Sequence, residues 1–207
     1  MKKHTAIALV LYAWASSIQA YDLSDKFYAG FSLGPTIPRY KANYIPIGQA
    51  NNKPNILSFN VSANVGKTFT NYGFEVSLSM LNFQRYKETY NVPITGQTTT
   101  RYTAFDVLFA GDFIYYIPAS PQLSFKLIIG VGALESLRYT TTKSQIATTS
   151  SSSESNFKLT PKAGIGLRYA LSDNISTTCS LNYAQPIDHA YLKRIIYANL
   201  GVNIHFS

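Results

Sequence analysis

The sequence has almost no cysteine and, after its first 20 residues, no long apolar run. Cys179 is the only cysteine among 207 residues, which excludes an intrachain disulfide and a cysteine-rich metal site. Later apolar stretches such as Leu127–Val131 fall far short of the about 20 residues that a transmembrane helix needs. A chain of this kind could cross a membrane only as a closed β-barrel.

Charged residues are also scarce. They make up 14% of the chain, whereas soluble proteins average about 25%. Tyrosine and phenylalanine are abundant instead, with 16 and 12 copies. This balance is unusual for a soluble secreted domain and typical of a membrane barrel with aromatic girdles.

Residues 1–20 have the pattern of a secretory signal peptide. Two lysines follow Met1, the apolar run Ala6–Ala15 comes next, and Ile18–Ala20 offers a small-residue cleavage site. The alternative is an anchoring helix, for which the apolar run is short. We therefore expect an exported chain whose barrel domain spans residues 21–207.

Eight segments alternate large apolar residues with small or polar ones, which is the period of a β-strand. The third segment loses its alternation near Leu81–Phe83, where we expect a bulge. The pattern predicts an all-β fold, an eight-stranded antiparallel up-and-down transmembrane β-barrel. The segments are Lys26–Leu33, Leu57–Phe69, Tyr72–Lys87, Arg101–Tyr116, Leu123–Arg138, Phe157–Leu171, Ile175–Tyr183 and Ile195–Phe206.

The connections between these segments alternate in length. The long ones are Pro35–Ile56, Glu88–Thr100, Tyr139–Asn156 and Ala184–Arg194, and the short ones are Thr70–Asn71, Pro118–Gln122 and Ser172–Asn174. Outer-membrane barrels have short periplasmic turns and long outer loops. We therefore expect a bacterial outer-membrane location with both termini in the periplasm and the long loops outside. The Ser- and Thr-rich stretch Thr140–Ser155 is expected to be a mobile loop.

The polar face of the strands is rich in glycine, serine and asparagine, whereas the other face is an almost unbroken series of Phe, Leu, Val and Ile. A soluble barrel would also alternate, but its outer face would carry many charged residues. Small residues suit a crowded interior, and lipid tolerates the apolar face. The glycine-rich face is therefore predicted to line the lumen.

A few charged residues fall on the predicted lumen face. Because buried charges are costly unless they are paired, we expect an internal salt-bridge network that blocks a wide pore; a gated ion path is the alternative. The residues expected at one depth near the periplasmic end are Glu75, Asp112, Lys126 and Arg168. Asp106 and Lys162 are expected further up and complete the network.

Basic residues gather in the long loops and at the adjacent strand ends. A basic rim is electrostatically suited to the phosphates of lipopolysaccharide, although ordinary solvated loop ends are the simpler interpretation. Nucleic acid is not an expected partner of an exported barrel, despite the pI of about 9.5. The predicted rim comprises Arg39, Lys41, Arg85, Lys87, Arg101, Arg138, Lys158, Lys193 and Arg194.

Residues for catalysis are few. After residue 20 only His189 and His205 remain as histidines; His189 follows Asp188, and Ser150–Ser153 lies in the preceding loop. A nucleophile needs a positioned base and an orienting group, and no such pattern is visible. We expect no enzyme activity, cofactor or metal, and we place His205 in the lumen near the periplasmic end.

Three segments resemble the opacity-protein and OmpA-like family of small outer-membrane barrels, and more weakly the surface antigens of intracellular bacteria: FYAGFSLG (Phe27–Gly34), Pro161–Tyr183 and ANLGVNIHF (Ala198–Phe206). The resemblance implies a non-enzymatic, monomeric surface protein in adhesion or envelope integrity, with loops that contact host or environmental ligands. A narrow porin-like channel and a lipid A-modifying enzyme are the alternatives.

The last strand is also similar to the recognition signal for the barrel-assembly machinery. That signal normally ends in an aromatic residue, whereas Ser207 follows Phe206 here. The residues expected to form it are Tyr197, Leu200, Val202, Ile204 and Phe206.

Overall fold

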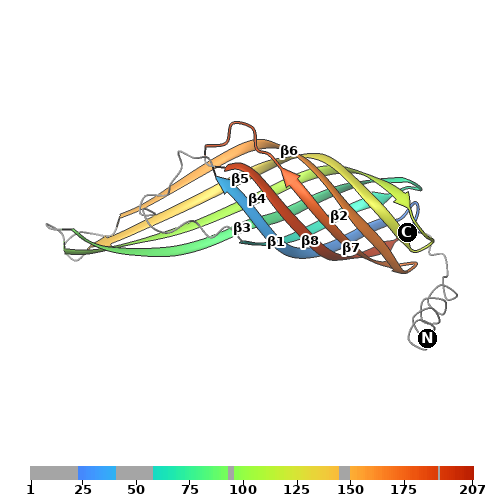
Figure 1. The fold of residues 1–207 in the computed structure, drawn as a ribbon, viewed down its shortest axis with the longest axis horizontal. Coiled ribbons are helices and arrows are strands. Elements are labelled where there is room, and N and C mark those ends of the chain that lie inside the picture. The colour runs from blue at the N-terminus through green and yellow to red at the C-terminus, as the bar shows by residue number, and fades with distance from the viewer. Residues whose placement is uncertain (1–22, 41–57, 93–95, 145–149, 191) are drawn as a thin grey trace, which may run out of the picture.

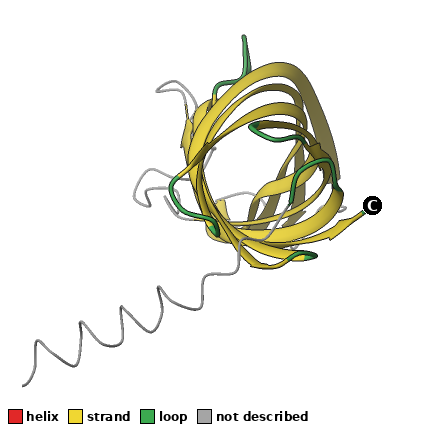
Figure 2. Cartoon of the chain, turned by 90° about the vertical axis from the view of Figure 1, so that its right-hand side faces the viewer, coloured by secondary structure: helices red, strands yellow, loops and turns green. Residues whose placement is uncertain are grey.

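The computed structural model describes residues 23–40, 58–92, 96–144, 150–190 and 192–207. Eight antiparallel strands form a closed barrel (Figures 1 and 2). The described residues contain no helix long and apolar enough to cross a membrane. The predicted signal peptide, Lys41 and most of the first long loop lie outside the described residues.

Every strand pairs with its neighbours in the sequence, and β1 also pairs with β8 to close the barrel. The strands are β1 Phe27–Tyr40, β2 Ser58–Thr68, β3 Tyr72–Val92, β4 Gly96–Pro118, β5 Leu123–Ser144, β6 Ser150–Ser172, β7 Ile175–Ala184 and β8 Leu192–Phe206. Phe27 lies opposite both Lys67 and Phe206. The start of β1, the C-terminus and the short turns therefore share one end of the barrel, at the right of Figure 1.

The two faces of the sheet differ as the alternation predicts. On the outer face large apolar side chains are exposed around the whole barrel, for example Phe31 at 52%, Ile165 at 60% and Leu200 at 62%. Water-soluble monomers rarely expose an apolar surface of this extent, and lipid would cover it. The fold prediction, including the direction of its apolar face, is confirmed.

Aromatic rings gather on the outer face at the short-turn end. Phe69 stacks on Tyr72 at 4.8 Å between ring centroids, and Phe74 meets Phe113 edge-on at 5.5 Å. Lys67 Nζ lies 4.9 Å from the ring centroid of Phe27. Aromatic rings interleaved with a basic side chain are typical of the interface between lipid and water.

The bulge that the sequence predicts lies in β3. The register with β4 shifts between Met80 and Asn82, and Leu81 between them is fully buried. The extra residue turns Leu81 into the lumen, while Met80 keeps its outward direction at 43% exposure. The prediction of a bulge near Leu81–Phe83 is confirmed.

The middle strands are much longer than the sequence predicts. β3, β4, β5 and β6 have 21 to 23 residues, whereas β2 and β7 have 11 and 10. The four long strands extend together beyond the rest of the barrel as a sheet, at the left of Figure 1. We call this part, residues 82–92, 96–105, 137–144 and 150–157, the sheet extension.

The expectation of a mobile loop at Thr140–Ser155 is therefore wrong over most of its length. β5 continues to Ser144 and β6 starts at Ser150, with Thr140 opposite Ser152. The Glu88–Thr100 loop is likewise mostly strand, and β1 runs on to Tyr40 past the expected start of the first loop. Threonine favours strands, and cross-strand hydroxyl pairs support the ladder; Thr100 and Thr142 approach to 3.3 Å.

One layer part-way along the lumen consists of apolar side chains rather than charges. We call this layer the apolar plug; it consists of Leu81, Leu108, Ala110, Leu134, Ala184, Leu192, Ile195 and Tyr197. None of these residues is more than 1% exposed. Their packing closes the lumen above a more polar lower half.

Glycines on the inner face leave room for this packing. A Cβ atom on Gly132 would lie 2.5 Å from the Phe109 carbonyl oxygen and 2.8 Å from Leu108 Cδ1. We predict that Gly132→Val lowers the free energy of unfolding by about 1–3 kcal/mol, since overpacking forces neighbours apart. Urea unfolding in detergent micelles measures this.

Gly111→Val is the matched control, because a Cβ on Gly111 meets nothing within 4 Å. Gly111 lies on the outer face of the neighbouring strand and is exposed. Equal loss of stability in the two variants would show that inner-face crowding is not the cause.

Candidate functional site

The lumen contains two polar sites separated by the apolar plug. The order of inward-facing residues along β4 shows this arrangement: Asp106 comes first, Leu108 and Ala110 belong to the plug, and Asp112 follows. We call the upper site the mouth network and the lower one the lumen cavity.

The lumen cavity is bounded by an ion pair. Lys162 Nζ donates to Asp112 Oδ2, and both side chains are almost fully buried. Asp112 on β4 and Lys162 on β6 both lie opposite Gly130 on β5. The glycine between them has no side chain, so lysine and aspartate meet across it; a Cβ there would overlap Asp112 Oδ1.

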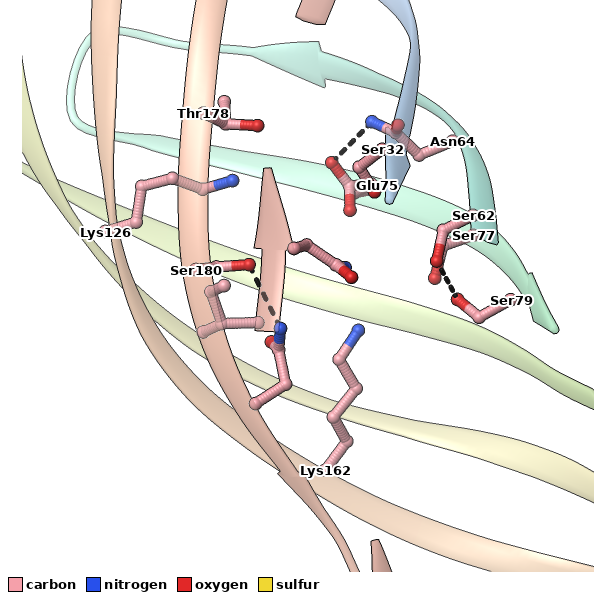
Figure 3. Close-up of a pocket in the computed structure, with 13 residues that line it drawn as sticks. Ser32, Ser62, Asn64, Glu75, Ser77, Ser79, Lys126, Lys162, Thr178 and Ser180 are labelled. Carbon is pink, nitrogen blue, oxygen red and sulfur yellow. Dashed lines mark hydrogen bonds between the residues drawn. The ribbon is translucent and has the colours of Figure 1, made fainter. Parts of the chain in front are cut away.

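Glu75 lies directly opposite Asp112 on the neighbouring strand β3 and is held by neutral donors. Its Oε2 accepts a hydrogen bond from the Tyr28 hydroxyl at 2.9 Å. The same oxygen accepts a second one from Asn64 Nδ2 at 2.8 Å (Figure 3). Hydrogen bonds to a carboxylate stabilise its charged form and are stronger than neutral ones. Glu75 forms no ion pair within 4.0 Å among the described residues.

The remaining volume of the cavity is small and polar. It measures about 30 Å³ for the centres of water-sized spheres, room for about two water molecules. Serine and asparagine side chains line most of it, and Lys126 and Lys162 enter from β5 and β6 (Figure 3). The cavity can hold a small ligand but is not a continuous pore.

Two cations near the cavity lack a carboxylate partner in the described part of the chain. Lys126 is 6% exposed and forms neither an ion pair nor a hydrogen bond there. The Arg168 guanidinium lies over the Tyr116 ring, with its Cζ atom 3.9 Å from the ring centroid. A cation over an aromatic ring is favourable, but Arg168 Nη1 has no hydrogen-bond partner.

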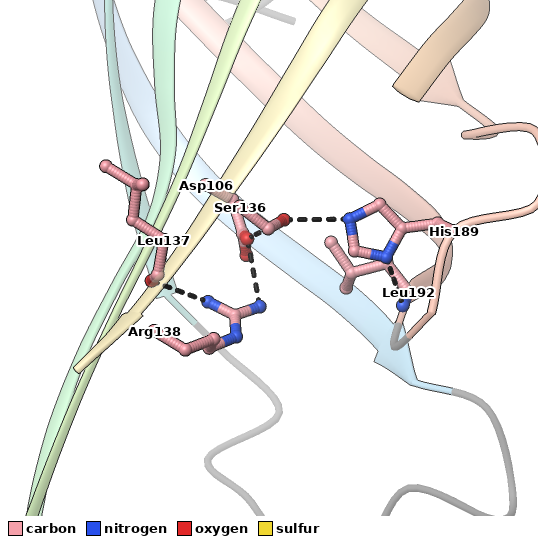
Figure 4. A network of polar contacts seen from close by, with 6 residues as sticks. All are labelled: Asp106, Ser136, Leu137, Arg138, His189 and Leu192. Carbon is pink, nitrogen blue, oxygen red and sulfur yellow. Dashed lines mark hydrogen bonds and ion pairs between the residues drawn. The ribbon is translucent and has the colours of Figure 1, made fainter. Parts of the chain in front are cut away.

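The mouth network joins β4, β5 and the β7–β8 connection (Figure 4). Ser136 Oγ donates to Asp106 Oδ1 at 2.5 Å, and Arg138 Nη2 lies 2.9 Å from the same oxygen. His189 Nε2 is 2.9 Å from Ser136 Oγ, and its Nδ1 accepts a hydrogen bond from the Leu192 backbone N–H at 3.0 Å. His189, Ser136 and Asp106 are fully buried.

A serine, a histidine and an aspartate are thus close together, but in the wrong order for catalysis. Because the Leu192 N–H donates to Nδ1 of His189, the neutral ring carries its proton on Nε2 and donates it to Ser136. A catalytic triad needs the reverse, with Nε2 free to accept the serine proton and the aspartate on Nδ1–H. The network instead fastens the β7–β8 connection over the lumen mouth.

Arg138 corrects one sequence prediction. It was expected on the lipopolysaccharide-facing rim, but β5 alternation directs it inward with Ser136, where it pairs with Asp106. Lys158 also lies on the inner face of its strand, in line with Thr160 and Lys162. Both corrections have the same cause: the rim prediction included the strand ends beside the long loops, whereas the alternation of these strands directs both side chains inward.

The other rim residues lie in different parts of the structure. Arg39, Arg101, Lys193 and Arg194 are exposed; the side chains of Arg85 and Lys87 and all of Lys41 lie outside what the structure describes. On the last strand Leu200, Val202, Ile204 and Phe206 point outward, and Tyr197 is buried in the plug. His205 is buried at the short-turn end, 2.9 Å from Ser176 Oγ.

The predicted charge network is thus divided. Asp112 and Lys162 form one pair at a shared depth, contrary to the expected difference, and Asp106 pairs with Arg138 above the plug. Tyr28, Asn64 and Ser136 were missed as partners. The alternation of the sequence shows that these side chains point inward. It does not show the register between neighbouring strands, which determines which side chains meet.

Comparison with known proteins agrees with this geometry. Residues 6–206 match the model of the outer membrane protein beta-barrel domain. The chain belongs to this family. It is therefore a bacterial outer-membrane barrel. No curated protein sequence matches the chain.

The chain is also similar to solved structures of low sequence identity, and the first two named here share its fold. Neisserial surface protein A is 16% identical, with a TM-score of 0.50 over 87% of this chain and 97% of its own. A major outer membrane protein of Thermus thermophilus is 11% identical, with a TM-score of 0.50 over 86% and 99%. Ail, the attachment invasion locus protein of Yersinia pestis, is 17% identical, with a TM-score of 0.46 over 88% and 99%.

The barrel of this family member depends on the Asp112–Lys162 pair. We predict that Lys162→Met lowers the free energy of unfolding by about 3–5 kcal/mol, because it leaves a carboxylate unpaired in the lumen. The double variant Lys162→Met/Asp112→Leu should recover most of this loss. Urea unfolding in micelles measures both. A double variant as unstable as the single one would contradict the ion pair, and Lys143→Met, on the exposed outer face, serves as control.

Proposed function

We propose that the protein is a non-enzymatic, non-conducting surface protein whose sheet extension contacts host or environmental macromolecules. The observation that carries this proposal is the combination of a closed lumen with a protruding four-stranded sheet. A channel would need an open lumen, whereas a contact surface needs an ordered structure that extends away from the membrane.

The orientation that we propose places both termini in the periplasm and the sheet extension outside. The short turns lie at the end that carries the start of β1 and the C-terminus, and the long strands leave from the other end (Figure 1). Short periplasmic turns and long outer segments are the rule for such barrels. We also propose that the exposed outer face of β8 is recognised by the barrel-assembly machinery. We further propose that the protein is a monomer and that it is cleaved after Ala20.

The outer face of the sheet extension supports a polar partner with negative charge. Arg101 and Lys143 are exposed there, among threonine and serine residues such as Thr103 and Ser151. Hydroxyl groups provide adaptable hydrogen bonds, and the basic side chains attract an acidic surface. No ligand is named by this chemistry, only its class.

We propose that lipopolysaccharide phosphates contact the rim of the barrel itself. Arg39 on β1 lies directly opposite Arg194 on β8, and both are exposed. Like charges opposite each other on neighbouring strands destabilise a sheet. An anionic phosphate between the two guanidinium groups would remove this repulsion, with Ile37 and Ile196 next along the strands on the side of the lipid.

A narrow channel is the second candidate function, and the apolar plug argues against it. Ions would have to cross a layer in which Leu81, Leu108 and Leu134 are fully buried. A dry apolar constriction is a barrier to ions. A lipid A enzyme is disfavoured by the proton order at Ser136 and His189.

The contact function is tested by shortening one hairpin. We replace residues 141–151 with Asn-Gly, a two-residue turn that joins Thr140 to its cross-strand neighbour Ser152. Cells that display this variant should bind host matrix and serum proteins several-fold less than cells with the unchanged protein. Arg101→Gln/Lys143→Gln should give a smaller loss that disappears at high salt.

The matched control is Arg39→Gln/Arg194→Gln. It should reduce lipopolysaccharide co-purification but leave binding by the sheet extension unchanged. If the shortened hairpin binds as well as the original at equal surface display, the sheet extension is not the contact surface.

Conductance of purified protein in planar bilayers tests the channel. We expect no steady current for the unchanged protein. Leu108→Ser/Leu134→Ser should introduce brief openings, because water enters a polar constriction more easily. Large steady currents without substitution would contradict the closed lumen.

A further inference from the structure

The lumen cavity and its walls carry more positive than negative charge. Five residues below the apolar plug bear a formal charge at neutral pH: Glu75, Asp112, Lys126, Lys162 and Arg168. Three are cations and two are carboxylates. Whichever pairs form, one positive charge remains in a lumen that lipid surrounds.

Such an excess is costly without a counter-ion. Transfer of an uncompensated charge from water into a low-dielectric interior costs several kcal/mol. Of the three cations only Lys162 has an ion-pair partner in the described part of the chain. Arg168 is partly compensated by the Tyr116 ring, which leaves Lys126 as the cation in greatest need of a partner.

Lys126 is placed to hold that partner. Its side chain is more than nine-tenths buried and lines the cavity from β5 (Figure 3). It donates no hydrogen bond to any described residue. The ammonium group therefore lies at the cavity without a hydrogen bond to a described residue, although Glu75 lines the same cavity.

The neighbouring hydroxyl groups have donors to spare as well. Ser180 Oγ accepts from Asn182 Nδ2 at 3.0 Å, and Ser79 Oγ accepts from Ser62 at 2.8 Å. Each of these accepting hydroxyls keeps its own proton for another acceptor. Both line the same cavity as Lys126, so an ion in the cavity would find hydroxyl donors as well as the ammonium group.

We propose that the lumen cavity binds one monovalent inorganic anion of about the size of chloride, beside Lys126 Nζ. One such ion cancels the excess charge and accepts hydrogen bonds from the ammonium group and the spare hydroxyls. Glu75 lines the same cavity and repels an anion, so the ion lies beside Lys126 rather than beside Glu75, whose Oε2 accepts hydrogen bonds from Tyr28 and Asn64. The cavity of about 30 Å³ admits a small ion and excludes sulfate or gluconate.

The anion stabilises the folded barrel only, since the unfolded chain has no cavity. We therefore measure thermal unfolding in neutral detergent micelles, with chloride exchanged for gluconate at constant ionic strength. The unfolding midpoint should rise by about 5–10 °C when chloride reaches about a hundred times its dissociation constant. Crystals grown in bromide should show an anomalous peak beside Lys126 Nζ.

Two variants remove the need for the ion in different ways. Lys126→Met deletes the unpartnered cation, and Thr178→Glu adds a carboxylate to the cavity wall. Both should lose the dependence on chloride. If Lys126→Met does not fold, Thr178→Glu still decides the question. Lys67→Met is the control, because Lys67 lies over the Phe27 ring on the outer face and should leave the dependence unchanged.

Three outcomes overturn the proposal. The first is identical unfolding in chloride and gluconate with no bromide peak, which leaves a cavity filled by water. The second is a chloride dependence that survives both cavity variants. The third is a bromide peak elsewhere in the barrel and none at Lys126.

Discussion

The closed hydrogen-bond ladder between β1 and β8 is the constraint on which the rest of the structure depends. In lipid no water can satisfy a free backbone N–H or C=O group, so the sheet must have no edge at membrane depth. Twelve residue pairs from Phe27–Phe206 to Tyr40–Leu192 close it. Closure with only eight strands makes a narrow barrel, and the narrow interior in turn dictates which side chains can point inward.

Inside the barrel, a residue without a side chain is as important as a charged one. Asp112, Gly130 and Lys162 occupy one row across three strands, and only the glycine allows the other two to meet. The apolar plug completes the closure above them. Polar and apolar groups therefore lie in layers along the axis, and the charges are confined to sites where a partner is within reach.

The sequence predicted the membrane-embedded part of the fold well and the sheet extension poorly, for one physical reason. Where one face meets lipid and the other the lumen, alternation is strong, and Leu57–Phe69 was placed within one residue of β2 at each end. Where both faces meet water, as in Thr140–Ser144, both can be polar and the alternation vanishes. Strands form there because threonine favours the extended conformation and because each segment pairs with the continuation of a neighbouring strand of the barrel.

The sequence predicts which side chains of the site point into the lumen, but not which of them form pairs. Alternation correctly directs Asp106, Lys126 and Lys162 inward, yet pairing depends on register between strands, which a single sequence does not contain. Arg138 illustrates the difference. Its place at a strand end beside a long loop suggested the rim, whereas in the structure it points inward and pairs with Asp106 at the mouth.

The strands that line the polar interior continue beyond the lumen mouth as the sheet extension. At the mouth, Ser136 and Arg138 of β5 both bind Asp106, and the sheet extension begins on the same strand at residue 137. The mouth network therefore fixes the base from which the extension projects. A barrel whose strands are anchored in this way can present an ordered surface without a pore, so a closed lumen and a long extension both agree with the contact function that we propose.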